Sequence, residues 1–318
     1  MPVAYIRSDY VNSVIGVFAC SCLYAPLATD DVFRHRKPMN ETTFTTENAT
    51  DGKTLFGRHH MPEKSTAKAV LSLVHGLGEH SGRYAEMAAW LNQRGIAVNL
   101  IDLHGHGQTP GGRGVCKSMD LMLDDIDALL EYSRTSVPGV PHFLMGHSMG
   151  GLLVLTYGLQ RRPSDLAGYI SQAPALEPVE LPPAIQLSIM RFLRPLLPKL
   201  AAANGIDPAT VSKDEDAVRA YVNDPLVHNK ICIALGLDLI DTGKWVRDNA
   251  GLWSDPLLLM HGDKDLLTSC AASQAFARDV GAHCTFEMVA DGFHEIHNDP
   301  EREKVYQRIA IWIDEKMN

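Results

Sequence analysis

The sequence has no excess of basic charge, since its 29 lysine and arginine residues stand against 38 aspartate and glutamate residues and the net charge is −9. A chain of this charge lacks the electrostatic footprint that a nucleic acid requires, so no nucleic-acid partner is expected. The same charge disfavours docking on anionic lipid by electrostatics alone. Low-complexity tracts and internal repeats are also missing. With 45% hydrophobic and 21% charged residues, the composition is that of an ordinary globular protein rather than a disordered one.

Motifs that hold nucleotides or metal ions are missing as well. Gly76 and Gly78 form a short glycine loop, but neither a G-x-G-x-x-G pattern nor a phosphate-binding lysine accompanies them. Histidine is frequent, with 14 residues, yet no spacing suggests converging metal ligands. We therefore expect no cofactor and no metal. The cysteines are scattered and are expected to be mostly reduced thiols. They are Cys20, Cys22, Cys116, Cys232, Cys270 and Cys284.

The apolar run within residues 14–28 is too short to span a bilayer as a helix. It makes a weak signal peptide, because Arg7 is accompanied by Asp9 in the segment that should be positive. A lipid-modified cysteine in this run is an alternative. Residues 1–40 are thus interpreted as an extension that is either a packed helix or a signal or anchor. The expected location is cytoplasmic or peripheral to a membrane, with export and lipid anchoring left open. Two N-x-T triplets, relevant only in a glycosylating compartment, begin at Asn40 and Asn48.

Strands and helices alternate along most of the 318 residues, a length that favours one large domain with an insertion. Apolar runs and a hairpin signal predict eight strands, at residues 43–46, 54–58, 69–74, 97–101, 142–145, 166–170, 257–260 and 285–289. Helices are predicted at 83–94, 118–136, 150–161 and 309–316. The second helix is expected to carry Asp124, Asp125 and Asp127 on its polar side. This order predicts the α/β class, with a mostly parallel eight-stranded sheet covered by helices on both faces.

The pattern changes between residues 174 and 249, where proline-punctuated helical segments replace the strands. We interpret this stretch as a helical cap inserted into a core made of residues 41–173 and 250–318. Within it, residues 184–200 have one apolar helical face. That face is either a lid that meets a lipid chain or a membrane surface, or a surface packed on the core. Its members include Ile185, Ile189, Phe192, Leu193 and Leu196.

A possible nucleophile stands in the motif Gly146-His-Ser-Met-Gly150, which follows a predicted strand and precedes a predicted helix. This is the context of the G-x-S-x-G elbow, in which the serine projects from a tight turn. Ser148 is therefore the predicted nucleophile. Because a free hydroxyl is weakly nucleophilic, it needs a base within hydrogen-bond reach.

Two later strand ends supply a carboxylate and an imidazole. In His261-Gly-Asp-Lys-Asp265, Asp265 is the predicted partner that orients the base, and Asp263 is predicted to be a turn residue. After the last strand, His294 is the predicted base, and His297 is predicted to be a helix-start or packing residue. The order Ser, Asp, His is that of the α/β-hydrolase arrangement. The loop after residues 69–74 and the elbow predict an oxyanion hole made by the backbone N–H groups of Leu77 and Met149.

Four motifs carry a resemblance to a known family: His75-Gly-Leu-Gly-Glu-His-Ser-Gly-Arg-Tyr84, Gly105-His-Gly-Gln-Thr109, Gly146-His-Ser-Met-Gly-Gly151 and His261-Gly-Asp-Lys-Asp265. From about residue 41 onward, the chain resembles the monoacylglycerol lipase and lysophospholipase branch of the α/β-hydrolases. The resemblance implies a serine esterase with a helical cap over an acyl tunnel. It places the triad at Ser148, Asp265 and His294 and the oxyanion hole at Leu77 and Met149. The cap matches mainly at residues 221–225, and residues 1–40 do not align.

The expected reaction is hydrolysis of a lipid ester, foremost a monoacylglycerol or lysophospholipid, to a free fatty acid and an alcohol through an acyl-enzyme. A short-chain carboxylesterase of broad specificity is the main alternative. An acyltransferase, an aminopeptidase and a silent binding module are weaker ones. Transient contact of the cap with a membrane surface is compatible with this expectation, and the sequence gives no oligomeric state.

Overall fold

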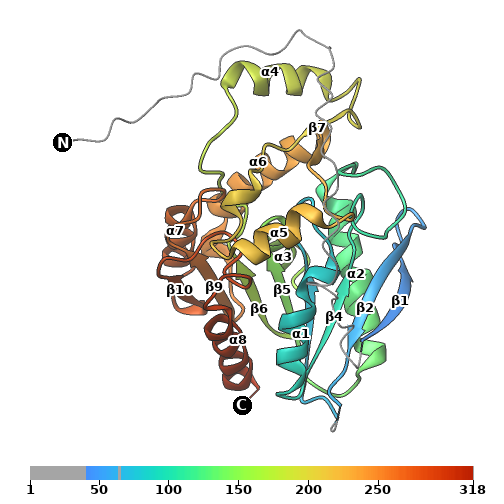
Figure 1. Ribbon diagram of the computed structural model, residues 1–318, viewed down its shortest axis with the longest axis vertical. Coiled ribbons are helices and arrows are strands. Elements are labelled where there is room, and N and C mark those ends of the chain that lie inside the picture. The colour runs from blue at the N-terminus through green and yellow to red at the C-terminus, as the bar shows by residue number, and fades with distance from the viewer. Residues whose placement is uncertain (1–40, 64–65, 318) are drawn as a thin grey trace, which may run out of the picture. The chain divides into compact units, whose positions relative to one another are not determined.

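The computed structural model describes residues 41–63 and 66–317. The predictions for residues 1–40, including the apolar run and Asn40, lie outside this part of the chain. Eight strands form one sheet in the order β1-β2-β4-β3-β5-β6-β9-β10 (Figure 1). The strands are β1 (Glu41–Glu47), β2 (Thr54–His60), β3 (Ala69–Val74), β4 (Ile96–Ile101), β5 (His142–His147), β6 (Leu166–Gln172), β9 (Leu257–Gly262) and β10 (Cys284–Val289). β2 pairs antiparallel with β1 and β4, and all other neighbours are parallel. The predicted mostly parallel eight-stranded sheet is confirmed.

Helices cover both faces of the sheet because its central strands are buried on both sides, as their unbroken apolar runs predicted. α1 (Ala85–Asn92) and α8 (Arg302–Lys316) share one hydrophobic cluster with the sheet. α2 (Met119–Ser136), α3 (Met149–Gln160) and α7 (Cys270–Val280) contribute to the cluster on the other face. The Ser118 hydroxyl caps α2 by accepting a hydrogen bond from the Leu121 amide at 3.3 Å.

Some element boundaries differ from the prediction. A 3-10 turn, η1 (Ser81–Tyr84), precedes α1, so the α-helix begins two residues later than expected. α8 begins at Arg302 rather than at residue 309. α7 was not predicted, although Ser269 caps its first turn and Gly281 ends it with a φ of +74°. Its buried residues Ala272, Phe276 and Val280 do lie at helical spacing, so the sequence carried a signal for this helix that was missed.

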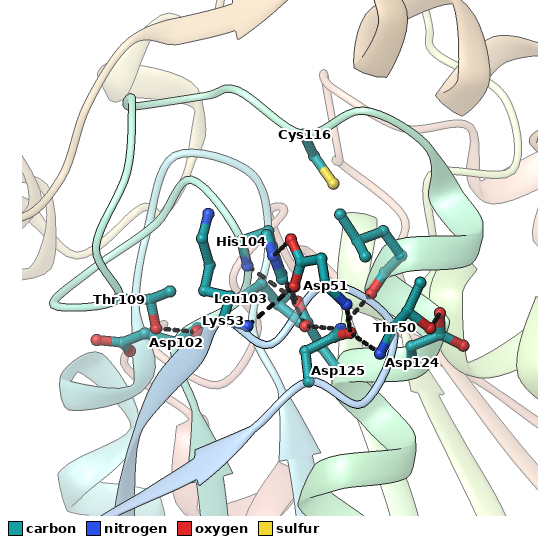
Figure 2. A network of polar contacts seen from close by, with 12 residues as sticks. Thr50, Asp51, Lys53, Asp102, Leu103, His104, Thr109, Cys116, Asp124 and Asp125 are labelled. Atoms are coloured by element: carbon teal, nitrogen blue, oxygen red, sulfur yellow. Dashed lines mark hydrogen bonds and ion pairs between the residues drawn. The ribbon is translucent and has the colours of Figure 1, made fainter.

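The expectation that Asp125 lies on the polar side of α2 is wrong. Asp125 is completely buried, and it accepts hydrogen bonds from Asn48 at 2.7 Å and from the backbone N–H of His104 at 3.0 Å (Figure 2). The helical period points this residue inward, and its polar partners replace the water that it loses. Asn48 is itself fully buried, so in this fold its side chain is inaccessible to glycosylation.

Residues 174–249, the stretch predicted to form the cap, contain α4 (Ala184–Leu193), η2 (Pro208–Thr210), α5 (Glu215–Asn223) and α6 (Ile233–Asp248). The same stretch also holds a two-stranded antiparallel ladder, β7 (Ala201–Ala203) with β8 (Lys230–Cys232), where only helices were expected. Three-residue strands are too short to show a period of two. α4 lies at the outer edge of the cap in Figure 1 and buries none of its residues.

Backbone and side-chain hydrogen bonds tie the cap to the core. His80 contacts Asp224 through Nε2 and Oδ2 at 2.8 Å, and the amide of His228 donates to the Gly78 carbonyl at 2.8 Å. The remaining short elements are η3 (Ala250–Leu252) and η4 (Gly281–His283). No helix in the described part of the chain has the length and apolarity needed to cross a bilayer. The four cysteines described, Cys116, Cys232, Cys270 and Cys284, are free thiols.

Candidate active site

Ser148 occupies the sharp turn between β5 and α3. Its backbone has φ 55° and ψ −116°, a left-handed conformation that is strained for a residue with a side chain. The turn is possible because two glycines flank it. A Cβ on Gly146 would lie 2.1 Å from the Gly150 carbonyl oxygen, and a Cβ on Gly150 would lie 2.2 Å from the Val74 carbonyl oxygen. The local sequence therefore forces the serine outward at the carboxyl end of the sheet, as a nucleophile elbow requires.

Three residues from three strand ends meet in one hydrogen-bond chain. The Oγ atom of Ser148 lies 2.9 Å from Nε2 of His294, and Nδ1 of the same ring lies 2.7 Å from Oδ2 of Asp265. His294 is 5% exposed and the Asp265 side chain is fully buried. The structure thus brings together all three residues predicted from the sequence.

The two candidate aspartates are clearly separated by their surroundings. Asp263 is exposed in the turn after β9 and its carboxylate lies 3.9 Å from Lys264. Asp265 turns inward, where its Oδ1 accepts the backbone N–H groups of Leu267 at 2.7 Å and Thr268 at 3.0 Å. Only Asp265 can orient the imidazole.

The negative charge of Asp265 and the positive charge that His294 can carry stabilise each other. Burial disfavours the carboxylate of Asp265, but nearby His294 and the hydrogen bonds from His261 and His294 lower its pKa far below the usual range. Burial also disfavours the charged form of His294, yet the charge and hydrogen bond of Asp265 outweigh it and raise the pKa of His294 above 6.5. An ionised carboxylate therefore faces an imidazole that holds a proton readily.

The predicted oxyanion donors stand beside Ser148. Met149 is the first residue of α3, so its N–H has no acceptor within the helix. The N–H of Leu77 has no acceptor among residues 41–63 and 66–317. The adjacent Gly76 N–H is held by Glu79 Oε1 at 2.6 Å, which leaves Leu77 as the free donor of this loop. His75 fixes the loop from below by accepting the Leu103 N–H at 3.0 Å.

A cavity of about 260 Å³ opens above Ser148. One part of its wall is apolar and comes from the oxyanion loop, the cap and the loop after Asp265; it consists of Leu77, Ile206, Val211 and Leu267. The other part is polar and includes Glu79, His147, Tyr221, His294 and Glu295. The cavity therefore offers both apolar and polar contacts to a group bound near the serine.

Sequence reasoning missed a buried charge cluster beside the site. Arg83 donates to both oxygens of Glu295 at 2.5 and 2.7 Å and to Glu79 at 2.7 Å, and the ring of Tyr221 lies 4.7 Å from its guanidinium carbon. Burial opposes the charge of Arg83, but Glu295 and then Glu79 raise its pKa well above the usual value of an arginine. The motif that contains Glu79 and Arg83 was recognised in the sequence. The pairing of Arg83 with Glu295 could not be predicted, because the two residues are 212 positions apart in the chain.

Two further histidines lie near His294, of which His147 contacts its ring and His297 contacts His147. His147 packs 4.8 Å from the ring of His294 and 4.7 Å from the ring of His297, measured between centroids. Burial followed by repulsion from His294 lowers the pKa of His147 to about 3, and burial followed by repulsion from His147 lowers that of His297 to about 3. His297 contacts Gln172 at 2.9 Å, as suits its predicted packing role. Within the described residues, no cluster of His, Cys, Asp and Glu is arranged to hold a metal ion.

Residues 65–301 match the family described as "Serine aminopeptidase, S33". This match covers well over half of the chain. The chain belongs to that family. An uncharacterized abhydrolase domain-containing protein of Dictyostelium discoideum is 36% identical over 84% of the chain, which spans only 28% of that protein's length. A monoacylglycerol lipase of Mycolicibacterium smegmatis is 31% identical over 77% of the chain and 88% of the relative.

Solved structures agree with this membership of the S33 family. The crystal structure of Paleococcus ferrophilus monoacylglycerol lipase matches with a TM-score of 0.74 and 33% identity, over 82% of this chain and 99% of that one. The predicted α/β-hydrolase fold and the resemblance to monoacylglycerol lipases are thereby confirmed.

Proposed function

We propose that this protein is a serine hydrolase that cleaves carboxylic esters of lipids, foremost monoacylglycerols or lysophospholipids. The observation that carries the proposal is the continuous hydrogen-bond chain from Ser148 through His294 to Asp265 at the base of a cavity with one apolar side. The relatives named monoacylglycerol lipase support the substrate class. The name of a Bacillus subtilis relative, a phospholipase, supports the lysophospholipid option.

The proposed mechanism is acyl transfer to water. Ser148 attacks the ester carbonyl while Nε2 of His294 takes the hydroxyl proton, and Asp265 stabilises the imidazolium that forms. The oxyanion is held by the backbone N–H groups of Leu77 and Met149. His294 then protonates the leaving alcohol. Water repeats the sequence on the acyl-enzyme and releases the fatty acid.

Membrane contact through α4 belongs to the same proposal. Ile185, Phe192 and Leu196 are 71%, 73% and 69% exposed, which leaves the apolar side of this segment without a partner in the described chain. The nearby Arg191 and Arg194 pair with Asp241 and Asp238, so little free positive charge remains for anionic lipid. We therefore propose a transient, peripheral contact through apolar insertion rather than through charge.

A short-chain carboxylesterase is the second candidate, and the size of the cavity favours it. Most of the 260 Å³ above Ser148 is open to solvent, and the enclosed part is only about 20 Å³, far below the roughly 300–1,000 Å³ of drug-sized ligand sites. An acyl chain of fatty-acid length must therefore displace part of the cap. An aminopeptidase is disfavoured because the cap residues that line the cavity, Ile206, Val211 and Tyr221, carry no carboxylate for a substrate amine.

The test measures fatty-acid release from a long-chain monoacylglycerol, beside a lysophospholipid and a short-chain aryl ester. Ser148→Ala serves as the blank and is expected to lose at least about a thousandfold in rate while staying folded. Preference for either lipid supports the proposal and selects the head group. Activity on the aryl ester alone replaces it with the second candidate, and retained activity in the blank removes Ser148 as nucleophile.

A further inference from the structure

A second histidine contacts the oxygen of Asp265 that faces His294. His261 is the last residue but one of β9 and is completely buried, and its Nε2 lies 3.0 Å from Oδ2 of Asp265. The same oxygen is 2.7 Å from Nδ1 of His294 and 2.8 Å from the Thr268 hydroxyl. One carboxylate oxygen is therefore shared by two imidazoles and one hydroxyl.

The partners of His261 define which of its nitrogens carries hydrogen. Nε2 faces Oδ2 of Asp265 and, at 3.1 Å, the Thr268 carbonyl oxygen. Both of these atoms are acceptors, so Nε2 must be protonated. Nδ1 lies 2.8 Å from the hydroxyl of Ser273 on α7, which is also completely buried. In the described part of the chain, the only acceptor for the Ser273 hydroxyl is Nδ1 of His261, which must then carry no hydrogen. With the ring neutral, the N–H at Nε2 and the O–H of Ser273 each have an acceptor.

We propose that His261 is a positioning residue, which holds the Asp265 carboxylate by a neutral N–H donor and moderates the negative charge that Asp265 presents to His294. The inference rests on the proposed function, because it concerns the orientation of the same base. A neutral donor on Oδ2 draws electron density from the oxygen that stabilises the His294 imidazolium. It also fixes the plane of the carboxylate. His261 does not touch Ser148 and acts only through Asp265.

Other ionisable groups surround this pair and are kept unchanged in the test. Those near His294 are His147 at the end of β5, Glu79 in the oxyanion loop, and Glu295, while His297 packs on His147. Those near Asp265 on its other side are Asp263 in the turn and Cys270 on α7. Because none of them donates to Oδ2, removal of the His261 donor has a distinct signature: His294 becomes a stronger base.

The experiment follows the rate at which a fluorophosphonate labels Ser148 between about pH 5 and 9, together with kcat/KM for an ester. In His261→Phe, the acidic limbs of the labelling rate and of kcat/KM are both expected to shift to higher pH by about 0.5–1 pH unit. The value of kcat is expected to fall about tenfold. His261→Gln, whose amide can place a donor near the position of Nε2, is expected to restore the limb. His142→Phe makes the same change at another buried strand histidine, at the start of β5, and is expected to leave the limb in place.

A second variant keeps the proposal testable if His261→Phe does not fold. His261→Asn can still contact Ser273 but is too short to reach Oδ2, so its limb is expected to move upward as well. An unmoved limb in the folded Phe or Asn variant overturns the positioning role. Absence of labelling in the wild-type protein is a different result, since it removes the triad and with it the proposed function.

Discussion

Asp125 contacts His104 through both of its carboxylate oxygens, each 2.8 Å from the ring Nδ1 (Figure 2). The other ring nitrogen of His104 faces Oδ2 of Asp51 at 3.1 Å. Asp125 lies on α2, His104 in the loop after β4, and Asp51 in the turn between β1 and β2. The buried imidazole of His104 thus connects helix α2, the loop after β4 and the turn between β1 and β2. Two predictions about stability depend on this contact.

Asp125→Ala is expected to lower the free energy of unfolding by about 3 kcal/mol, because Nδ1 of the buried His104 ring loses its carboxylate partner and the Asn48 amide loses one of its two acceptors. Asp124→Ala is the matched control one residue earlier. The Asp124 side chain is 18% exposed and pairs with Arg161, so its loss is expected to cost no more than about 1 kcal/mol. Urea unfolding followed by circular dichroism gives both values. Equal losses in the two variants would contradict the role of Asp125.

The stability supplied by His104 is expected to depend on pH. Burial opposes its charge, but the hydrogen bond and charge of Asp125, and then Asp51, raise its pKa above 6.5. A raised histidine pKa stabilises the fold fully below the unfolded value and loses this effect as the pH rises through the folded value. The stability difference between wild type and His104→Gln should therefore be largest below pH 6.5 and shrink at higher pH. Urea titrations at several pH values measure it, and a difference that grows with pH would show the opposite sign.

The sequence specified the features whose causes are local. Ser148 and its two glycines are adjacent, so the elbow was readable from three positions, and the buried strands were readable from unbroken apolar runs. Partners distant along the chain were not readable. Periodicity places Asp125 on the buried face of α2, but it does not reveal the partner that makes a buried carboxylate possible, His104, which lies 21 positions away.

The same reason explains what was missed at the site. His261 was noted only as part of its motif, since its contact with Asp265 follows from the turn after β9 and its contact with Ser273 from α7, a helix that was not predicted. The apolar face of residues 184–200 was predicted correctly as a pattern. Whether this face packs on the core could not be predicted, because it depends on how residues 174–249 fold. In the structure the face points away from the core at Phe192, which is 73% exposed.

Gly150→Ala is expected to lower the rates of ester hydrolysis and of Ser148 labelling by at least about a hundredfold. Its Cβ would lie 2.2 Å from the Val74 carbonyl oxygen and 2.6 Å from that of His75, so either the elbow or the oxyanion loop must move. Gly251→Ala is the control, because nothing lies within 4 Å of the added atom. A shift of about 1 Å at a reacting group costs on the order of a hundredfold in rate. Unchanged kcat in folded Gly150→Ala would show that the elbow tolerates the displacement.

The pH dependence of kcat/KM is expected to show an acidic limb with its midpoint above pH 6.5. His294 must be neutral to accept the proton of Ser148, and Asp265 raises its pKa despite burial. Activity should therefore fall as the pH drops through this value. Asp265→Asn is expected to move the midpoint downward and to lower kcat, whereas Asp263→Asn, at an exposed position, should do neither. If the acidic limb moved in Asp263→Asn and stayed in place in Asp265→Asn, the assignment of the two aspartates would be reversed.

Substitutions on α4 separate membrane contact from catalysis. Phe192→Glu puts a charge on an apolar segment that supplies no residue to the lining of the cavity, so chemistry at Ser148 should not change. Hydrolysis of a soluble short-chain ester is expected to stay within about twofold, because α4 buries none of its residues and the change is at the surface. Activity on monoacylglycerol in vesicles, and co-sedimentation with them, should both fall, since inserting a carboxylate among lipids is unfavourable.

The matched control for this test is Ile311→Glu, which makes a similar change at a residue of α8 that is 45% exposed and outside the cap. If the loss reflects contact of α4 with the membrane, only Phe192→Glu shows it. A vesicle of neutral lipid is the stricter probe, because Arg191 and Arg194 are already paired with aspartates and the contact should not need anionic lipid. Equal losses in the two variants would mean that added negative charge, not the apolar face of α4, reduces the contact.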